Sequence, residues 1–319
     1  MKKPILYIVI PCYNEQGVLE ITSKLFLDEL QSLIKEQIVS NKSKILFVND
    51  GSKDNTWLII EKLCKKNKEM SGLSLSRNMG HQNALLAGLM ESKRHCDITI
   101  SIDCDGQDDI SVMNTMISEY KNGCEIVYGV RDNRKKDSFF KRFTAESFYK
   151  VLKKMGVEVV YNHADYRLVS SKVLEEFSKF NEVNLFLRGM FPLVGFKSSI
   201  VYYTRNERIA GESHYPIKKM ISLALNGITS LSIKPIRIIT ILGIISSIIC
   251  FCFIIWAFIC YLIGKTVAGW ASMTSIICFF SSVQLIGIGV IGEYIAKIYM
   301  EAKHRPRYII SERININDK

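Results

Sequence analysis

Short apolar segments rich in isoleucine and valine recur through the first 130 residues, and longer segments with apolar side chains every three or four positions separate them. The short segments predict β-strands, which are expected near residues 5–10, 44–48, 73–75, 98–102 and 126–130. Residues 54–66 show the helical pattern, because Trp57, Ile60 and Leu63 share one face and Asp54 can cap the start. This alternation predicts an α/β fold with a Rossmann-like, mostly parallel sheet covered by helices.

The pattern changes in the second half of the chain. From about Phe139 onward the alternation fades, and helices are expected instead. Residues 238–264 and 270–292 contain no charged side chain, and each run is long enough to cross a hydrocarbon core of about 30 Å as a helix. The short link between them predicts an antiparallel two-helix transmembrane hairpin. A buried hairpin of a soluble protein is the alternative, which such long uncharged runs disfavour.

Charges beside the hairpin predict its orientation. Lys265 is the only charged residue of the link, whereas basic residues flank both outer ends. Basic loops normally stay in the cytoplasm, so both termini are expected there. The apolar run at residues 1–10 is too short for a signal peptide. The expected organisation is a cytosolic domain at 1–214, an interfacial amphipathic segment at 215–235, a transmembrane hairpin at 236–299 and a cytosolic basic tail at 300–319.

Composition narrows the function classes. The 319 residues carry a net charge of +11, which suits anionic lipid headgroups and phosphorylated ligands. No zinc-finger, helix-turn-helix or RNP signature is found, so nucleic acid is not an expected partner. The nine cysteines include no Cys-x-x-Cys pair and are expected to be reduced packing residues. The pattern Gly287 to Gly292 resembles a dinucleotide-binding motif, but it lies inside a predicted span and favours helix packing.

Polar clusters follow the predicted strands where each strand ends, at residues 11–15, 49–52, 77–81 and 103–105. Because the carboxyl ends of parallel strands meet at one edge, these clusters are expected to line one crevice. The segment Asp103 to Asp109 contains four carboxylates and the amide of Gln107. Such hard oxygen ligands suit a divalent cation that also binds a diphosphate. An acidic turn that caps the next helix is the alternative.

Together these motifs resemble the inverting family 2 glycosyltransferases, whose catalytic domain has the GT-A fold. The similarity is greatest to the polyprenyl-phosphate glycosyltransferases, in the bactoprenol (undecaprenyl-phosphate) glucosyltransferase branch. It spans essentially the whole chain. The matching segments are residues 8–15, 48–54, 76–81, 103–108, 165–167, 208–213, 292–294 and 303–308.

The resemblance implies transfer of a hexose, with glucose favoured, from a UDP-sugar to undecaprenyl phosphate. Inversion at the anomeric carbon, a Mg²⁺ or Mn²⁺ cofactor and a site on the cytoplasmic face of the bacterial plasma membrane follow from it. Membrane lipids, a homo-oligomer such as a tetramer and a flippase are candidate partners. The alternatives are transfer from GDP-mannose, as in dolichyl-phosphate-mannose synthases, and a non-catalytic membrane protein that binds a lipid or a flippase.

The resemblance also implies the donor site. Its nucleotide-sugar-binding residues are Pro11, Tyr13, Glu15, Asp50 and Asp103. The implied metal ligands are Asp105 and Gln107, with Asp103 beside them, and Asp105 therefore counts as catalytic. For Pro11 and Tyr13, a rigid turn with a packed aromatic ring is an equal alternative.

On the acceptor side, the resemblance implies three phosphate-binding arginines, Arg131, Arg167 and Arg208. A guanidinium can bind a phosphate through two parallel hydrogen bonds. Asp165 and Arg167 are predicted to be catalytic. A phosphate monoester is ionised near neutral pH, so Asp165 could orient sugar hydroxyls or hold Arg167 instead of acting as a base. Arg77 and His81 are interpreted as a helix-entry residue and a surface histidine, outside the site.

Overall fold

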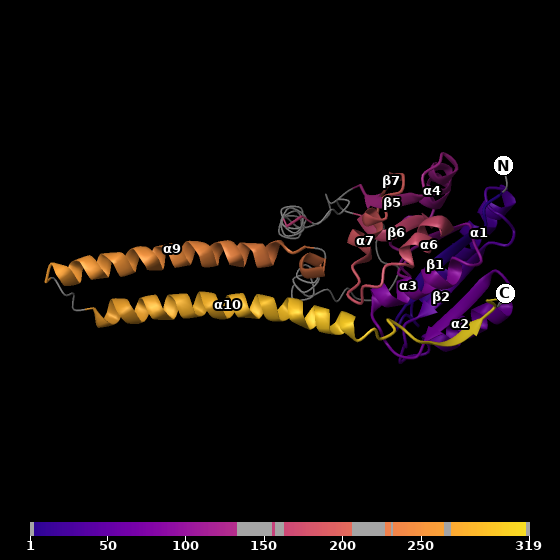
Figure 1. The fold of residues 1–319 in the computed structure, drawn as a ribbon. Coiled ribbons are helices and arrows are strands. Elements are labelled where there is room, and N and C mark those ends of the chain that lie inside the picture. Colours follow the sequence, from indigo (N-terminus) through magenta and orange to yellow (C-terminus); the bar gives the residue numbers. More distant parts are fainter. Residues whose placement is uncertain are drawn as a thin grey trace.

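The computed structural model of this chain contains an α/β domain from which two long helices project (Figure 1). The two helices are α9 (Lys234–Leu262) and α10 (Trp270–Ala302). The structure describes residues 3–132, 155–156, 163–205, 227–230, 232–264 and 269–316.

The described strands form one sheet of eight in the order β7-β5-β6-β4-β1-β2-β3-β8. Four of the seven strand pairs are parallel, and the pairs β4–β6, β5–β6 and β3–β8 are antiparallel, so the sheet is mixed. The strands are β1 (Leu6–Cys12), β2 (Lys44–Asn49), β3 (Met70–Leu75), β4 (Ile98–Ser101), β5 (Ile126–Arg131), β6 (His163–Ser170), β7 (Ser198–Tyr203) and β8 (Ile310–Ile314).

Helices cover both faces of the sheet, and alternate residues of β1 pack on opposite sides. Ile8 and Ile10 belong to one core, and Tyr7 and Val9 belong to the other. Because both faces are buried, the strands read as continuous apolar runs. The first core includes α1 (Leu19–Lys35), α2 (Thr56–Lys66) and α4 (Val112–Lys121), and the second includes α3 (His81–Ser92), α6 (Ser171–Phe177) and α7 (Leu187–Leu193).

The five strands predicted before Phe139 are confirmed as β1 to β5. The later strands β6, β7 and β8 were not expected, because the strand pattern fades there. The cysteines of the α/β domain are free and buried, which agrees with a packing role; they are Cys12, Cys64, Cys96, Cys104 and Cys124.

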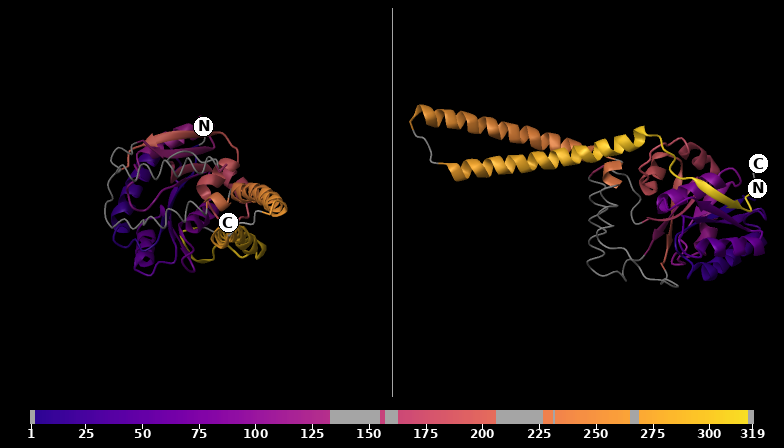
Figure 2. Two further views of the ribbon diagram at one scale, coloured as in Figure 1. Left: turned by 90° about the vertical axis from the view of Figure 1, so that its left-hand side faces the viewer. Right: turned by 90° about the horizontal axis from the view of Figure 1, so that it is seen from below.

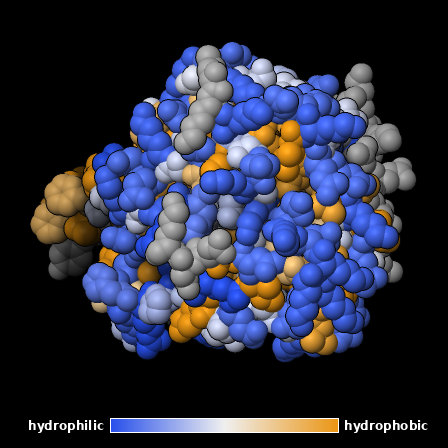
Figure 3. All heavy atoms as spheres, turned by 90° about the vertical axis from the view of Figure 1, so that its right-hand side faces the viewer, coloured by the Kyte–Doolittle hydropathy of each residue, from blue (hydrophilic) through white to orange (hydrophobic). Residues whose placement is uncertain are grey.

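Helices α9 and α10 expose apolar side chains on all sides; Phe251 is 64% exposed and Leu285 is 69% exposed. Both helices are long and apolar enough to cross a membrane by length and composition. In contrast, the face of the α/β domain farthest from them is mainly hydrophilic (Figure 3). The pattern of solvent-exposed residues therefore differs between the two parts of the molecule.

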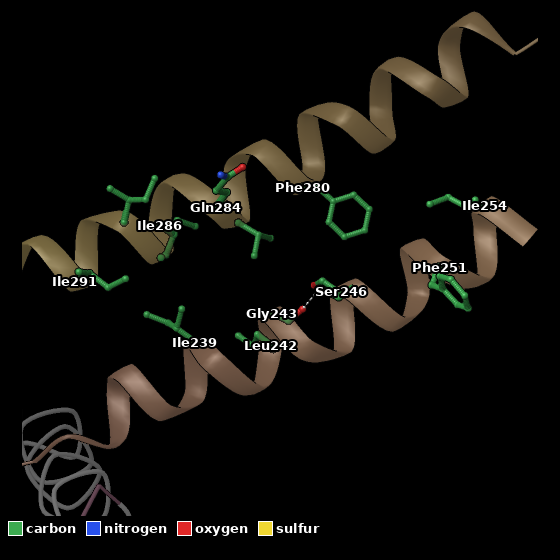
Figure 4. A pocket seen from close by; sticks show the side chains of 14 residues that line it. Ile239, Leu242, Gly243, Ser246, Phe251, Ile254, Phe280, Gln284, Ile286 and Ile291 are labelled. Carbon is green, nitrogen blue, oxygen red and sulfur yellow. Dashed lines mark hydrogen bonds between the residues drawn. The ribbon is translucent and has the colours of Figure 1, made fainter.

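The two long helices approach each other closely at Gly287. A Cβ atom there would lie 3.3 Å from Cγ2 of Ile239, whereas Gly289 and Gly292 have nothing so close. Of the three predicted packing glycines, Gly287 is therefore the one at a helix contact. Beside it, an apolar cavity of about 770 Å³ separates the helices, and the side chain of Gln284 lies along it (Figure 4).

After α10 the chain returns to the sheet, where β8 pairs with the edge of β3 (Figure 2). We call residues 303–316 the C-terminal strap. The Asn315 amide donates to the carbonyls of Cys64 at 2.7 Å and Met70 at 2.9 Å. Arg313 binds Glu91 through two hydrogen bonds of 2.9 and 3.3 Å. Along the sequence, the helical hairpin is thus inserted between β7 and β8, which belong to one sheet.

Candidate active site

The loops at the carboxyl ends of β1 to β4 meet at one edge of the sheet, which we call the crevice. Its first two loops, after β1 and β2, are bound to each other. The Asn14 N–H donates to Ser52 Oγ at 3.0 Å, and Asn14 Oδ1 accepts from the Lys53 N–H at 2.9 Å. Gly51 has φ +60°, and a Cβ there would lie 2.4 Å from the carbonyl carbon of Arg77. Only glycine fits this position, because the loop after β3 passes directly against it.

Four of the five residues predicted to bind the nucleotide sugar lie at these strand ends. Tyr13 is 41% exposed, whereas Pro11 is buried within β1 and Glu15 is half-buried. Asp50 is 2% exposed and accepts hydrogen bonds from the N–H groups of Met79 at 2.7 Å and Gly80 at 3.0 Å. Burial raises the pKa of Asp50, and these two donors oppose the shift. Asp50 therefore orders the loop that leads into α3.

The acidic loop, residues 103–109, follows β4. Asp105 is 8% exposed, and its Oδ1 accepts from the Gln107 N–H at 3.1 Å. The Arg205 guanidinium donates to Gln107 Oε1 and lies 4.0 Å from Asp105 Oδ2. The Asp103 side chain is 33% exposed.

The donor set of the acidic loop fits a divalent cation. Asp103, Asp105 and Gln107 offer two carboxylates and an amide oxygen, which are ligands that Mg²⁺ and Mn²⁺ accept. Within the described part of the chain, no group of three or more His, Cys, Asp or Glu side chains could hold a metal by itself. A cation here would therefore take further ligands from a diphosphate and water.

A second group, the Asp165 cluster, consists of Asp165, Arg167, Arg188 and His81. Arg167 Nη2 donates to Asp165 Oδ1 at 2.6 Å. Arg188 binds the same carboxylate through both oxygens, at 3.3 Å from Nε and 3.0 Å from Nη2. His81 Nε2 lies 3.5 Å from Asp165 Oδ2 and 3.6 Å from Asp103 Oδ1. The histidine thus connects this cluster with the acidic loop.

The electrostatics of the cluster keep Asp165 ionised. Burial alone would raise the pKa of Asp165, but Arg188, His81 and Arg167 together hold that pKa well below its usual range. Burial lowers the pKa of His81, yet the hydrogen bond to Asp165 and the charge of Asp103 leave it raised overall. A carboxylate with a lowered pKa is a weak base, so the geometry favours Asp165 as an anchor for cations.

Arg167 differs from its predicted role. Its side chain has no exposed surface, Nη1 donates to the Leu187 carbonyl at 3.3 Å, and the guanidinium lies 4.7 Å from the centre of the Phe191 ring. Asp165 and Arg167 alternate with Tyr166 on β6 and therefore point to the same face of the sheet. Because the Arg167 side chain is fully buried, a direct contact with a lipid phosphate does not fit this position.

Arg131 ends β5 as predicted and is partly exposed. Its Nε donates to the Tyr203 hydroxyl at 3.2 Å, and its Nη2 lies 3.5 Å from Asp108 Oδ1. The Tyr203 hydroxyl donates to the same carboxylate at 2.7 Å. Burial and the charge of Asp103 raise the pKa of Asp108 to about 6. Arg208, the third predicted acceptor arginine, lies outside the described residues.

Sequence reasoning missed three side chains of the crevice: His81, Arg188 and Arg205. His81 stands inside a matching motif and is the first residue of α3, so its position was a usable signal. Arg188 and Arg205 come from a region where no strand or motif was predicted, and only the folded chain brings them to the carboxylates.

Comparison with known proteins agrees with this architecture. Residues 7–178 match the model of the glycosyl transferase family 2. An uncharacterized glycosyltransferase of Bacillus subtilis, YkoT, is 51% identical over 97% of this chain and 91% of its own length. A bactoprenol glucosyl transferase of Shigella phage SfV is 40% identical over 95% of this chain and 97% of its own length. A prophage homolog of that enzyme in Escherichia coli is 39% identical over 95% of this chain and 97% of its own length.

The α/β domain with strand-end carboxylates is the GT-A fold of a glycosyltransferase. The chain belongs to the glycosyl transferase family 2.

Proposed function

We propose that this enzyme transfers a hexose, with glucose favoured, from a UDP-sugar to undecaprenyl phosphate. The product is a polyprenyl-phosphate-linked monosaccharide with inverted anomeric configuration. The observation that carries the proposal is the similarity to the bactoprenol glucosyl transferase of Shigella phage SfV, which covers 95% of this chain. A match of that length takes in the hairpin and extends well beyond the 7–178 region that the family model covers.

The acidic loop supplies an electrostatic environment that suits this reaction. The acceptor phosphate oxygen forms a bond to the anomeric carbon while the bond to the β-phosphate oxygen breaks, and the bonding electron pair leaves with UDP. Asp103, Asp105 and Gln107 would hold Mg²⁺ or Mn²⁺, which offsets the charge that develops on the leaving diphosphate. Arg205 adds a guanidinium to this donor side. A dianionic phosphate carries no proton on the attacking oxygen, so no side chain has to remove one.

The proposed location is the plasma membrane of a bacterium, with the catalytic domain and both termini in the cytoplasm. Two apolar helices and the basic residues at their outer ends support this orientation. The last turns of α10 also bind the catalytic domain, where Glu301 accepts from the N–H groups of Val183 at 2.6 Å and Asn184 at 3.3 Å. A homo-oligomer and a flippase partner stay predictions.

The test is incubation of the purified full chain in detergent with undecaprenyl phosphate, Mg²⁺ and a panel of nucleotide sugars. Mass spectrometry of the lipid product identifies the sugar that is transferred, and we expect hexosyl undecaprenyl phosphate from UDP-glucose. A product from GDP-mannose alone would contradict the proposed donor. Sugar transfer to water or to a free sugar without any lipid product would contradict the proposed acceptor.

A further inference from the structure

Arg188 is a cation of the crevice to which neither the motifs nor the relatives give a role. It stands at the start of α7, and its side chain is 30% exposed, whereas the Arg167 side chain is fully buried. Both guanidinium groups bind Asp165, one from the core and one from the crevice. Arg188 is therefore the arginine of the Asp165 cluster that a ligand in the crevice can reach.

The backbone beside Arg188 is fixed by two hydrogen bonds of Leu187, the first residue of α7. The Leu187 N–H donates to Gln82 Oε1 at 3.1 Å, and the Leu187 carbonyl accepts from Arg167. Gln82 follows His81 at the start of α3. The start of α3 therefore places His81 directly and places Arg188 through the hydrogen bond between Gln82 and Leu187. The hydrogen bonds to Asp165 then hold the Arg188 side chain in place.

The segment before α7 also connects Arg188 to the long helices. Glu301 of α10 binds the N–H groups of Val183 and Asn184, and the Arg307 guanidinium donates to the Phe180 carbonyl. Figure 1 shows α7 on the side of the domain that faces α9 and α10. A ligand that reaches the crevice from the hairpin side therefore meets the part of the domain that carries Arg188.

The charges of the Asp165 cluster favour an anion. Two guanidinium groups, from Arg167 and Arg188, face the single carboxylate of Asp165, so these three side chains sum to one positive charge. A guanidinium has five N–H donors in a planar fork. The fork matches a phosphate, which can accept two parallel hydrogen bonds.

We propose that Arg188 binds the phosphate of the acceptor lipid and that Asp165 fixes Arg188 for this contact instead of removing a proton. This inference rests on the proposed function. Asp165 is then a positioning residue, and Arg188 is the phosphate ligand that the buried Arg167 cannot be. The lowered pKa of Asp165 agrees with this division, because the carboxylate stays charged and keeps its two arginines in place.

The test compares Arg188→Ala and Arg188→Lys with the wild-type enzyme in detergent. Wild-type activity with UDP-glucose and undecaprenyl phosphate is measured first, because its absence would refute the proposed function and not this inference. The KM for undecaprenyl phosphate is expected to rise roughly 10- to 100-fold in Arg188→Ala, the range for a lost charged hydrogen bond. In Arg188→Lys it is expected to rise less, because an ammonium keeps the charge without the fork. UDP affinity is expected to stay within about twofold of wild type in both variants.

Arg313→Ala is the matched control, because Arg313 also binds a carboxylate, Glu91, through two hydrogen bonds, but on the C-terminal strap. Its KM for undecaprenyl phosphate should equal that of wild type. Thermal unfolding in detergent reports whether each variant is folded, and Arg188→Lys decides the test if Arg188→Ala is unfolded. An unchanged acceptor KM in a folded Arg188 variant overturns the proposal, and so does a loss of UDP affinity as large as the loss of acceptor affinity.

Asp165→Asn provides a second measurement. If Asp165 acts by positioning Arg188, the double variant Asp165→Asn/Arg188→Ala should have an acceptor kcat/KM within about twofold of the lower single variant. If the two losses multiply, Asp165 acts independently of Arg188 and the positioning role is wrong. Removal of Asp165 leaves Arg167 buried without its carboxylate. Where thermal unfolding shows that Asp165→Asn is unfolded, the Arg188 variants alone decide.

Discussion

Aspartates on the two sides of the crevice have opposite surroundings. In the acidic loop, Asp105 lies 4.0 Å from the Arg205 guanidinium, and Asp103 lies 3.6 Å from His81, which is shared with the other side. Across the crevice, Asp165 contacts two arginines and a histidine within 3.5 Å. Under the proposed function, the first side would bind a cation from solution, whereas the second already carries cations of the protein itself. The same type of side chain would then serve the donor or the acceptor according to its neighbours.

The largest expected effect is on the acidic loop. Asp105→Asn should lower kcat roughly 100-fold or more, because a charged metal ligand is lost where diphosphate charge must be offset. The measurement is Mg²⁺-dependent release of UDP. Asp109→Asn is the matched control, because Asp109 Oδ1 accepts only local hydrogen bonds from Ser111 at 3.0 and 2.7 Å. Near-normal turnover of folded Asp105→Asn at saturating Mg²⁺ would remove Asp105 from the metal site.

His81 touches both sides, so its removal should affect both substrates. His81→Ala is expected to raise the KM for UDP-glucose and the KM for undecaprenyl phosphate, each roughly 5- to 10-fold, because one hydrogen-bonding group near Asp103 and Asp165 is lost. Steady-state kinetics with each substrate varied in turn measures this. His95→Ala serves as the control, since His95 stacks on Tyr7. A change in only one of the two KM values would show that His81 acts on one side of the crevice and does not connect the two.

Arg205 should belong to the donor side alone. Arg205→Ala is expected to raise the KM for UDP-glucose roughly 3- to 10-fold, because a partly exposed guanidinium near Asp105 and Gln107 no longer supports the diphosphate. The KM for undecaprenyl phosphate should stay within about twofold. An effect on the acceptor larger than that on the donor would contradict this assignment and would place Arg205 with Arg188.

The smallest expected effect concerns the support of Arg131. Tyr203→Phe removes the hydroxyl that donates to Asp108 and accepts from Arg131. It should lower the free energy of unfolding by about 1 to 3 kcal/mol and change turnover less than twofold. Thermal unfolding in detergent gives the first quantity. Tyr202 lies on the same strand and is 63% exposed. Tyr202→Phe should leave the free energy of unfolding and the turnover unchanged. A loss of turnover of more than twofold in folded Tyr203→Phe would show that Arg131 and Tyr203 take part in the chemistry.

The difference between the two sides also explains how far the sequence was informative. The acidic loop is a continuous segment after a strongly apolar strand, so its position at the sheet edge could be predicted. The Asp165 cluster combines residues 81, 165, 167 and 188, and long-range folding alone brings them together. His81 was interpreted as a surface residue because nothing in its local sequence indicates Asp165.

The later strands were missed for a related reason. β6 buries Asp165, Tyr166 and Arg167, and such polar residues do not form the apolar run that predicts an internal strand. β8 is an edge strand with Glu312 and Arg313 exposed, as edge strands commonly are. The first five strands have no charged residue in their interiors, and their pattern was sufficient.

The return of β8 to β3 has a consequence for biosynthesis. The ribosome makes α9 and α10 before it makes β8, so the outer edge of β3 stays unpaired while the hairpin is being made. An open edge is a site for wrong pairing with other chains. The catalytic sheet can therefore gain its last strand only after both apolar helices have been made. Completion of the α/β domain is tied in this way to synthesis of the hairpin.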